Sequence, residues 1–395
     1  MRFADLIAPL PVERFMSDYF GRRPLHLPAS ESPGRTSLVD WQRMNALLAI
    51  RSHWTPANIK LIINSRPVYP NLYFEDVETS DGPVRRASAA KVRALLATGA
   101  SLVADSVEDI SPEIRALASA LSEQFSGKAG ANLYCSFEGV QAFASHCDLH
   151  EVFAIQCEGE KRWNIYENPA LAPVEPLLGE DAQATIDSVK GKVAMQVRMQ
   201  PGDLLYIPRG FYHDALASGG ASLHVTLAVL PLTARVLFGM LEEDAVHDPA
   251  FREYLPDARL EGGAILAERL SELADRLAAI LRSPRFATDV ATRQRQLWDR
   301  EPPFTLPERG RAEFYARTDR PAEVRREDRG VVLAAAGTSR ELHHLHGAAE
   351  WILGQTAFTV QQLAADFRHV EEAELRDLVR DLERLRLISR YEPAR

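Results

Sequence analysis

The sequence has few cysteines and no long apolar run. Its three cysteines, Cys135, Cys147 and Cys157, lie close together but form no CxxC pair, so we expect a reducing compartment and no disulfide framework. Because a run of about 18 apolar residues occurs nowhere, we expect no membrane span, and the first residues lack the apolar core of a signal peptide. Together these absences predict a cytoplasmic protein.

The sequence also lacks the common phosphate-binding and acyl-transfer motifs and has no excess of positive charge. No G-x-G-x-x-G, Walker A or G-x-S-x-G pattern occurs. The formal net charge of −9 argues against a dedicated nucleic-acid-binding protein, which would usually present a basic face. With 395 residues, of which 46% are hydrophobic, the chain is long enough for two or three domains with cores of their own.

The hydrophobic periodicity changes twice along the chain. Helical spacing prevails up to about residue 130, apart from short extended segments such as SLVAD (101–105). Between residues 130 and 231, short apolar or alternating runs are separated by turn-forming residues, among them EGE (158–160) and SGG (218–220), which we interpret as a hairpin turn. This middle region therefore predicts an all-β barrel or sandwich.

After Pro231 the pattern is mainly helical again. GAILAERLSELADRLAAILRSP predicts a strongly amphipathic helix, whereas the Arg-, Asp-, Glu- and Pro-rich region 283–330 predicts loops and short strands at a domain junction. The last 50 residues predict three compact helices, the second with Thr359 as its cap, and then a short polar strand. This order resembles a winged helix-turn-helix.

Two residues in the β-rich region have the spacing of metal ligands. His146 and Asp148, placed at i and i+2 on one strand, would project from the same face and could bind one ion. The best third ligand is His213, at the exit of a turn in PGDLLYIPRGFYHDA, and its main rival is His224 eleven residues later. Two imidazoles and one carboxylate form the facial triad of non-haem Fe(II) oxygenases.

Such a triad leaves three coordination positions open. They can take two oxygens of a chelating 2-oxo acid together with O₂, and the acid supplies two electrons as it loses CO₂. An H-x-D tripeptide alone is weak evidence, because each of its residues also has an ordinary structural role. A second histidine-rich stretch, His343, His344 and His346, fits metal binding only loosely, and we interpret it as solvated or capping a helix.

Two stretches around these residues carry a family resemblance. GANLYCSFEGVQAFASHCDLHEVFAIQCEGEKRWNIYENP (130–169) and PGDLLYIPRGFYHDALASGGASLHVTLAVLP (201–231) resemble the JmjC-type ribosomal oxygenases, the cupin-4 group of Fe(II)- and 2-oxoglutarate-dependent protein hydroxylases. The resemblance implies an α+β chain built on a double-stranded β-helix. It also implies His146, Asp148 and His213 as metal ligands and catalytic centre, with His224 only lining the pocket.

The resemblance further implies three regions and their roles. They are a JmjC catalytic domain (1–235), a helical dimerisation region (236–305) that makes a homodimer, and a winged-helix-like domain (306–395). Ten acidic and seven basic residues from Glu341 onward, with Arg alternating with Asp and Glu on the last helix, argue against DNA binding by this last domain.

The co-substrate site follows from the same resemblance. Lys161, fifteen positions after His146, matches the basic residue that binds the distal carboxylate of 2-oxoglutarate, and Tyr134 matches a tyrosine that joins it. Asn132 and Thr226 are expected to face the same pocket. The chain departs from the family at Cys147, where an aromatic residue is common, and at Ala228, where some relatives carry a hydroxyl.

The leading hypothesis is therefore a protein hydroxylase that acts on a ribosomal protein. Lysine at position 161 resembles the relatives that act on histidine, whereas the bacterial arginine hydroxylases tend to have arginine there, so a histidyl or an arginyl side chain is the expected target. Two alternatives stay open. One is the same chemistry on another protein or a biosynthetic peptide, and the other is a non-catalytic cupin-like adaptor.

Overall fold

The computed structural model describes residues 2–31, 35, 38–80, 82–137, 143–298, 313–327, 330–335 and 338–391. The chain divides into two compact units, Met1–Glu301 and Pro302–Arg395. The helices of the region 236–305 belong to the first unit, so the boundary expected near residue 235 stays a prediction. No described helix is long and apolar enough to cross a membrane.

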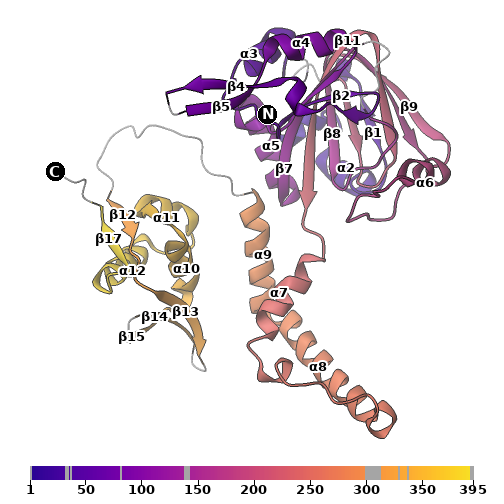
Figure 1. Ribbon diagram of the computed structural model, residues 1–395. Coiled ribbons are helices and arrows are strands. Elements are labelled where there is room, and N and C mark those ends of the chain that lie inside the picture. Colours follow the sequence, from indigo (N-terminus) through magenta and orange to yellow (C-terminus); the bar gives the residue numbers. More distant parts are fainter. Residues whose placement is uncertain are drawn as a thin grey trace. The chain divides into compact units, whose positions relative to one another are not determined.

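The first unit combines nine described helices with one large sheet and a separate ribbon, β4–β5 (Figure 1). Its helices are α1 (Phe3–Ile7), α2 (Val12–Asp18), α3 (Trp41–Leu48), α4 (Ala89–Ala97), α5 (Pro112–Phe125), α6 (Ala182–Val189), α7 (Val236–Ala245), α8 (Ala264–Arg282) and α9 (Pro284–Trp298). Helix α5 begins where the sequence encodes a start, because the Ser111 hydroxyl accepts a hydrogen bond from the Ile114 amide and Pro112 is the first helical residue.

Nine strands pair antiparallel in the large sheet, in the order β1-β10-β8-β11-β7-β6-β2-β3, with β9 also paired to β8. The strands of this unit are β1 (Leu25–Leu27), β2 (Ile59–Ile63), β3 (Arg66–Pro67), β4 (Phe74–Thr79), β5 (Gly82–Ala87), β6 (Ser101–Ala104), β7 (Gly127–Ser136), β8 (Glu151–Tyr166), β9 (Val193–Met199), β10 (Leu204–Ile207) and β11 (His213–Pro231). The predicted β-rich middle region thus forms the centre of the unit.

Strands β8 and β11 are longer than the sequence pattern suggested. The predicted turns at EGE (158–160) and SGG (218–220) are wrong, because each lies inside one continuous strand. The β8–β11 pairing instead shifts its register between Ser218 and Leu223. Gly159, at φ +61°, lies so close to the Ala221 carbonyl oxygen that a Cβ there would be 1.8 Å from it. A glycine therefore marks a bend in a long strand pair.

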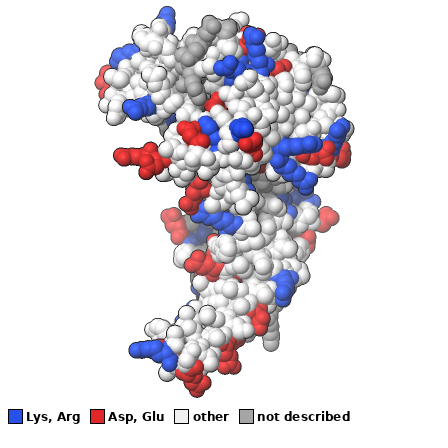
Figure 2. All heavy atoms as spheres, turned by 90° about the vertical axis from the view of Figure 1, so that its right-hand side faces the viewer, with Lys and Arg blue, Asp and Glu red and all other residues white. Residues whose placement is uncertain are grey.

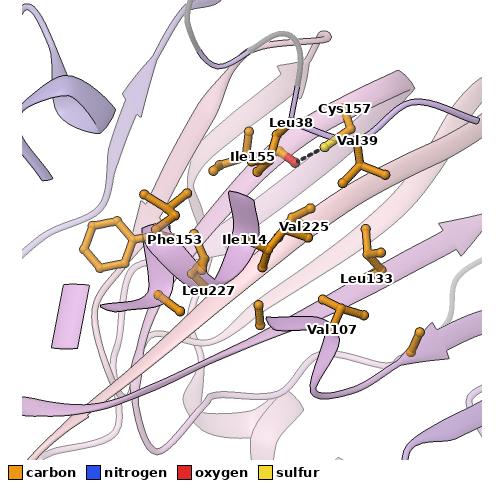
Figure 3. Close-up of a cluster of buried hydrophobic side chains, with 14 of the residues drawn as sticks. Leu38, Val39, Val107, Ile114, Leu133, Phe153, Ile155, Cys157, Val225 and Leu227 are labelled. Carbon is orange, nitrogen blue, oxygen red and sulfur yellow. Dashed lines mark hydrogen bonds between the residues drawn. The ribbon is translucent and has the colours of Figure 1, made fainter. Parts of the chain in front are cut away.

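The two faces of β8 border different parts of the interior. Phe153 and Ile155 pack with Val225 and Leu227 of β11 and with Ile114 of α5, as Figure 3 shows. A second cluster inside the barrel contains Val152 and Ala154, which have the opposite parity on β8. Its other members are Trp163, Ile165, Val197, Met199, Leu205 and Ile207. The inner face of the barrel is therefore the one that can line a site.

Helices α7–α9 extend from the barrel, and the sequence reading of their last part was wrong. Residues 284–298 form helix α9, where loops and short strands were expected. Pro284 suits the first turn of a helix, the Ser283 hydroxyl accepts from the Phe286 amide, and Phe286 is buried. Helix α8 has no buried residue along its length, although it is amphipathic. Figure 2 shows acidic and basic side chains interspersed over the face of the molecule in that view.

The second unit contains three helices and two small described sheets. Its elements are β12 (Phe314–Arg317), β13 (Ala322–Glu327), β14 (Gly330–Ala335), β15 (Thr338–Glu341), α10 (His346–Gly354), β16 (Ala357–Thr359), α11 (Val360–Asp366), α12 (Glu372–Arg384) and β17 (Ile388–Arg390). Thr359 caps α11 as predicted, and its hydroxyl accepts from the Gln362 amide. The three helices and the final strand were all expected, and β12 and β13 lie in the region where short strands were expected, whereas β14, β15 and β16 were not predicted.

Candidate metal centre

His146 and Asp148 lie in a short segment that runs antiparallel to the start of β11. The backbone amides of His146 and His213 each donate to the other's carbonyl oxygen, at 3.0 and 2.8 Å. The Gly210 amide donates to the Asp148 carbonyl oxygen at 3.0 Å. The segment is an isolated bridge and no regular strand, so the expected strand placement was wrong, but the pairing still places residue 146 beside residue 213.

The three predicted ligand side chains converge. One ligand atom each from His146, Asp148 and His213 lie within 4.8 Å of one another, and His213 Nε2 is 3.5 Å from Asp148 Oδ2. The Nδ1 atoms are engaged elsewhere, His146 with the Ala144 carbonyl and His213 with the Phe211 carbonyl, both at 2.9 Å. A carbonyl oxygen can only accept a hydrogen bond, so Nδ1 of each ring must carry the hydrogen and donate it. Nε2 of each ring then keeps its lone pair for a metal ion.

The electrostatics of the cluster suit a cation. Burial alone would raise the pKa of Asp148, but the neighbouring imidazoles, His213 first, hold it below its usual value. Burial, together with the nearby His146, lowers the pKa of His213 to about 4, so this ring is neutral at pH 7. One carboxylate and two imidazoles whose Nδ1 atoms face carbonyl oxygens are a donor set that fits Fe(II), and they would leave other positions on the ion open.

A pocket of about 270 Å³ opens beside the three ligand atoms. Its lining holds all seven residues predicted for the metal and co-substrate. The full lining is Asn132, Tyr134, Phe143, His146, Asp148, His150, Val152, Lys161, Trp163, His213, Ala215, His224, Thr226 and Ala228. The pocket is thus large enough for a small organic acid next to an ion.

Lys161 is buried in this pocket without an ion-pair partner among the described residues. Its Nζ lies 5.9 Å from the ring centre of Tyr134 and 5.8 Å from that of Trp163. Burial lowers the pKa of Lys161 to about 7 and raises that of Tyr134, whose hydroxyl therefore stays protonated. A buried lysine and a phenol hydroxyl that line one pocket are groups with which a protein can bind a carboxylate.

His224, the rival ligand, lies apart from the metal cluster. Its ring stacks on Tyr134 at 4.7 Å between centres, and burial holds its pKa well below the usual value. Its Nδ1 is buried without a hydrogen-bond partner in the described part of the chain, as is Trp163 Nε1. His224 therefore lines the pocket floor, as expected.

Sequence reasoning missed Phe143, His150 and Trp163 in the pocket. Trp163 could have been found, because it lies two residues after Lys161 and so shares its strand face. The ring of Phe143 lies 5.8 Å from that of His146, and no periodicity marks it. His150 Nε2 is 4.0 Å from Asp148 Oδ1, so it neighbours the cluster without joining it.

A family comparison agrees with this arrangement. Residues 108–237, which include every predicted site residue, match the model of the JmjC domain. Residues 108–237 belong to the JmjC domain family. The predicted JmjC domain is thereby confirmed, and so is the JmjC/cupin fold with its mixed helices and antiparallel sheet.

Curated relatives share this domain and differ in length. Residues of the chain are 31% identical, over 57% of its length, to the bifunctional lysine-specific demethylase and histidyl-hydroxylase NO66 of Drosophila persimilis. They are 32% identical, again over 57%, to ribosomal oxygenase 1 of Gallus gallus. The matched regions make up 31% and 36% of these two relatives, so the chain spans about a third of their length.

Solved structures match the JmjC-domain chain along almost its whole length. The ribosomal oxygenase YcfD from Escherichia coli, in complex with cobalt and 2-oxoglutarate, superposes with a TM-score of 0.51 at 16% identity. The match covers 96% of this chain and 98% of that one. YcfD in complex with cobalt and succinic acid gives a TM-score of 0.52. At this identity the likeness shows the fold alone.

Proposed function

We propose that the JmjC-domain protein is an Fe(II)- and 2-oxoglutarate-dependent oxygenase that hydroxylates a protein side chain. One observation carries the proposal: the ligand atoms of His146, Asp148 and His213 converge in the same pocket as Lys161, which is buried and has no ion-pair partner in the described part of the chain. A metal site alone would fit many functions. A metal site and a carboxylate site in one small pocket fit a chelating dicarboxylate co-substrate.

Each residue has a defined task in this proposal. His146, Asp148 and His213 hold Fe(II), which when bound supplies the redox chemistry that couples O₂ reduction to loss of CO₂ from 2-oxoglutarate. Lys161 and Tyr134 bind the distal carboxylate, and Asn132 and Thr226 line the pocket around the co-substrate. The Ala144 and Phe211 carbonyls fix both histidine rings with Nε2 directed to the ion.

The names of the relatives support a ribosomal protein as the target. A histidyl side chain is the first candidate, because NO66 relatives are named histidyl-hydroxylases and position 161 is lysine. An arginyl side chain is the second. Hydroxylation of another protein or peptide keeps the same site, and a non-catalytic adaptor would have no use for a buried lysine beside three convergent ligands.

Two measurements test the proposal. Anaerobic titration of the metal-free chain with Fe(II) and then 2-oxoglutarate should show both binding, and O₂ should then release succinate and CO₂. Mass spectrometry of ribosomal proteins from wild-type and deletion cells should find one peptide that is about 16 Da lighter in the deletion. A chain that binds neither Fe(II) nor 2-oxoglutarate would leave the adaptor hypothesis in its place.

The remaining regions have proposed roles as well. We infer a homodimer through residues 236–305, because α8 exposes Leu270 and Leu281 on an amphipathic helix without a buried residue. Sedimentation should give twice the monomer mass at micromolar concentration, and a monomer would refute the dimer. The order of α10, α11, α12 and β17 supports a winged helix that contacts protein, and DNA binding is not expected. A cytoplasmic location fits a ribosomal target.

A further inference from the structure

The bridge between His146 and His213 has a second face, which points away from the metal. Ser145 precedes one histidine and Asp214 follows the other, so both project to the opposite side of the pair from the two imidazoles. Both are buried, and the Ser145 hydroxyl donates to Asp214 Oδ2 at 2.8 Å. One side-chain hydrogen bond therefore joins the two histidine-bearing segments directly behind the metal site.

Asp214 is the centre of a larger network. Besides Ser145, its carboxylate accepts from the Tyr166 hydroxyl at 2.5 Å and from Asn164 Nδ2 at 2.9 Å, both at the end of β8. Lys190 Nζ, just after α6, donates to the Ser145 hydroxyl oxygen at 2.9 Å and lies 4.4 Å from the ring centre of Tyr166. Asp214 thus accepts bonds from two segments of the chain, and Lys190 joins the network from a third segment through Ser145.

The Asp214 carboxylate accepts all three bonds from side-chain donors, namely the Tyr166 hydroxyl, the Asn164 amide and the Ser145 hydroxyl. A carboxylate acceptor makes such bonds stronger than bonds between neutral groups. The network can therefore hold its three segments firmly.

The segment that bears His146 is held to the barrel by few hydrogen bonds. The hydrogen bonds that join it to β11 and to the turn before β11 are the backbone pair of His146 with His213, the bond from Gly210 to Asp148, and the bond from Ser145 to Asp214. We propose that Asp214 is a positioning residue that sets the spacing of the two histidine ligands through Ser145. This inference rests on the proposed metal site.

A purely structural role for Asp214 would predict a different result, and Asp203 provides the matched control. Asp203 is equally buried and accepts from the Ala29 amide at 2.8 Å and the Gln200 amide at 3.1 Å, and it contacts His26 Nε2 at 2.9 Å. It fastens the N-terminal strand β1 to the barrel away from the pocket lining. Replacing it should cost stability without moving a metal ligand.

The test is titration of the metal-free full chain with cobalt(II), using wild type, Asp214→Asn, Ser145→Ala and Asp203→Asn. An asparagine at position 214 would have one acceptor oxygen and one NH₂ group. Because the NH₂ group is itself a donor, it cannot accept from Ser145, Tyr166 or Asn164, so at least one of the three bonds is lost. We expect Asp214→Asn to weaken cobalt affinity about tenfold, as for other residues that orient ligands. Ser145→Ala should weaken it in the same direction, and Asp203→Asn should leave it within about twofold while lowering the melting temperature.

Three outcomes would overturn the inference. Wild-type cobalt affinity in both Asp214→Asn and Ser145→Ala would show that the network does not position the ligands. An equal loss in Asp203→Asn would assign the effect to general stability. If Asp214→Asn does not fold, Ser145→Ala alone decides. Failure of the wild type to bind cobalt would refute the metal site itself, and this inference with it.

Discussion

Two groups of histidines in this chain look alike in composition and differ in structure. His146 and His213 are distant in sequence, paired by backbone bonds, and fixed by carbonyls on Nδ1 so that Nε2 faces Asp148. His343, His344 and His346 are nearly consecutive and lie on a 3₁₀ turn and the start of α10.

The consecutive histidines have ordinary surface partners. His344 Nε2 lies 3.3 Å from Glu374 Oε2, and His343 Nε2 lies 3.6 Å from Glu341 Oε2, all on exposed side chains. The difference teaches that a metal site requires imidazole rings that are held in one orientation beside a buried carboxylate. Several histidines close together in the sequence do not by themselves meet this requirement.

The sharpest test of this comparison changes one residue at the predicted metal site and one residue among the consecutive histidines. Asp148→Ala should reduce 2-oxoglutarate decarboxylation below detection, because it removes the only carboxylate of the predicted triad. His344→Ala is the matched control and should leave decarboxylation unchanged. Succinate release, measured with circular dichroism as a check of folding, decides the matter, and full activity in Asp148→Ala would disprove the triad.

The same comparison shows what a sequence can and cannot predict here. Strand parity paired His146 with Asp148, and the resemblance added Lys161, Tyr134, Asn132 and Thr226. The turns at EGE and SGG were wrong, because glycine marks both a turn and a bend in a long strand, and only the approach of Gly159 to Ala221 distinguishes them. Helix α9 was missed because its polar composition outweighed the start signal at Pro284.

Contacts that link distant segments could not be predicted from the sequence at all. Asp214 follows a predicted ligand, yet its partners Ser145, Asn164 and Tyr166, and Lys190 behind Ser145, come from segments whose proximity only the folded barrel creates. Phe143 enters the pocket in the same way. These residues carry no periodicity or motif of their own.

The next largest effect concerns the buried cation. Lys161→Ala should raise the KM for 2-oxoglutarate about 100-fold with a smaller change in kcat, because the carboxylate would then be buried without its cationic partner, at a cost of about 3 kcal/mol. Steady-state kinetics with varied 2-oxoglutarate measure it. An exposed lysine such as Lys91 is the control, and an unchanged KM for Lys161→Ala would refute its role.

The pH dependence of co-substrate affinity should be smaller and has a definite sign. Burial lowers the pKa of Lys161 to about 7 in the empty pocket, so the ammonium that binds the carboxylate is present below pH 7 and is lost above it. Above pH 7, binding must be accompanied by proton uptake, and the apparent affinity for 2-oxoglutarate should fall by up to about tenfold per pH unit. Calorimetry in buffers of different ionisation enthalpy measures this uptake directly. Lys161→Arg, which stays charged, should flatten the dependence between pH 7 and 9, whereas an equally steep slope in that variant would assign the titration to another group.

The smallest effect belongs to the exposed histidines. Because both side chains of the His344–Glu374 pair are about half exposed, solvent and salt screen their interaction, and pairs of this kind contribute about 0.2–1 kcal/mol. Glu374→Gln should therefore change the free energy of unfolding of the full chain by less than about 1 kcal/mol, as measured by urea denaturation. It should also leave cobalt binding at the wild-type level. A loss of cobalt binding in this variant would mean that the consecutive histidines take part in metal binding after all, and the contrast between the two groups would fail.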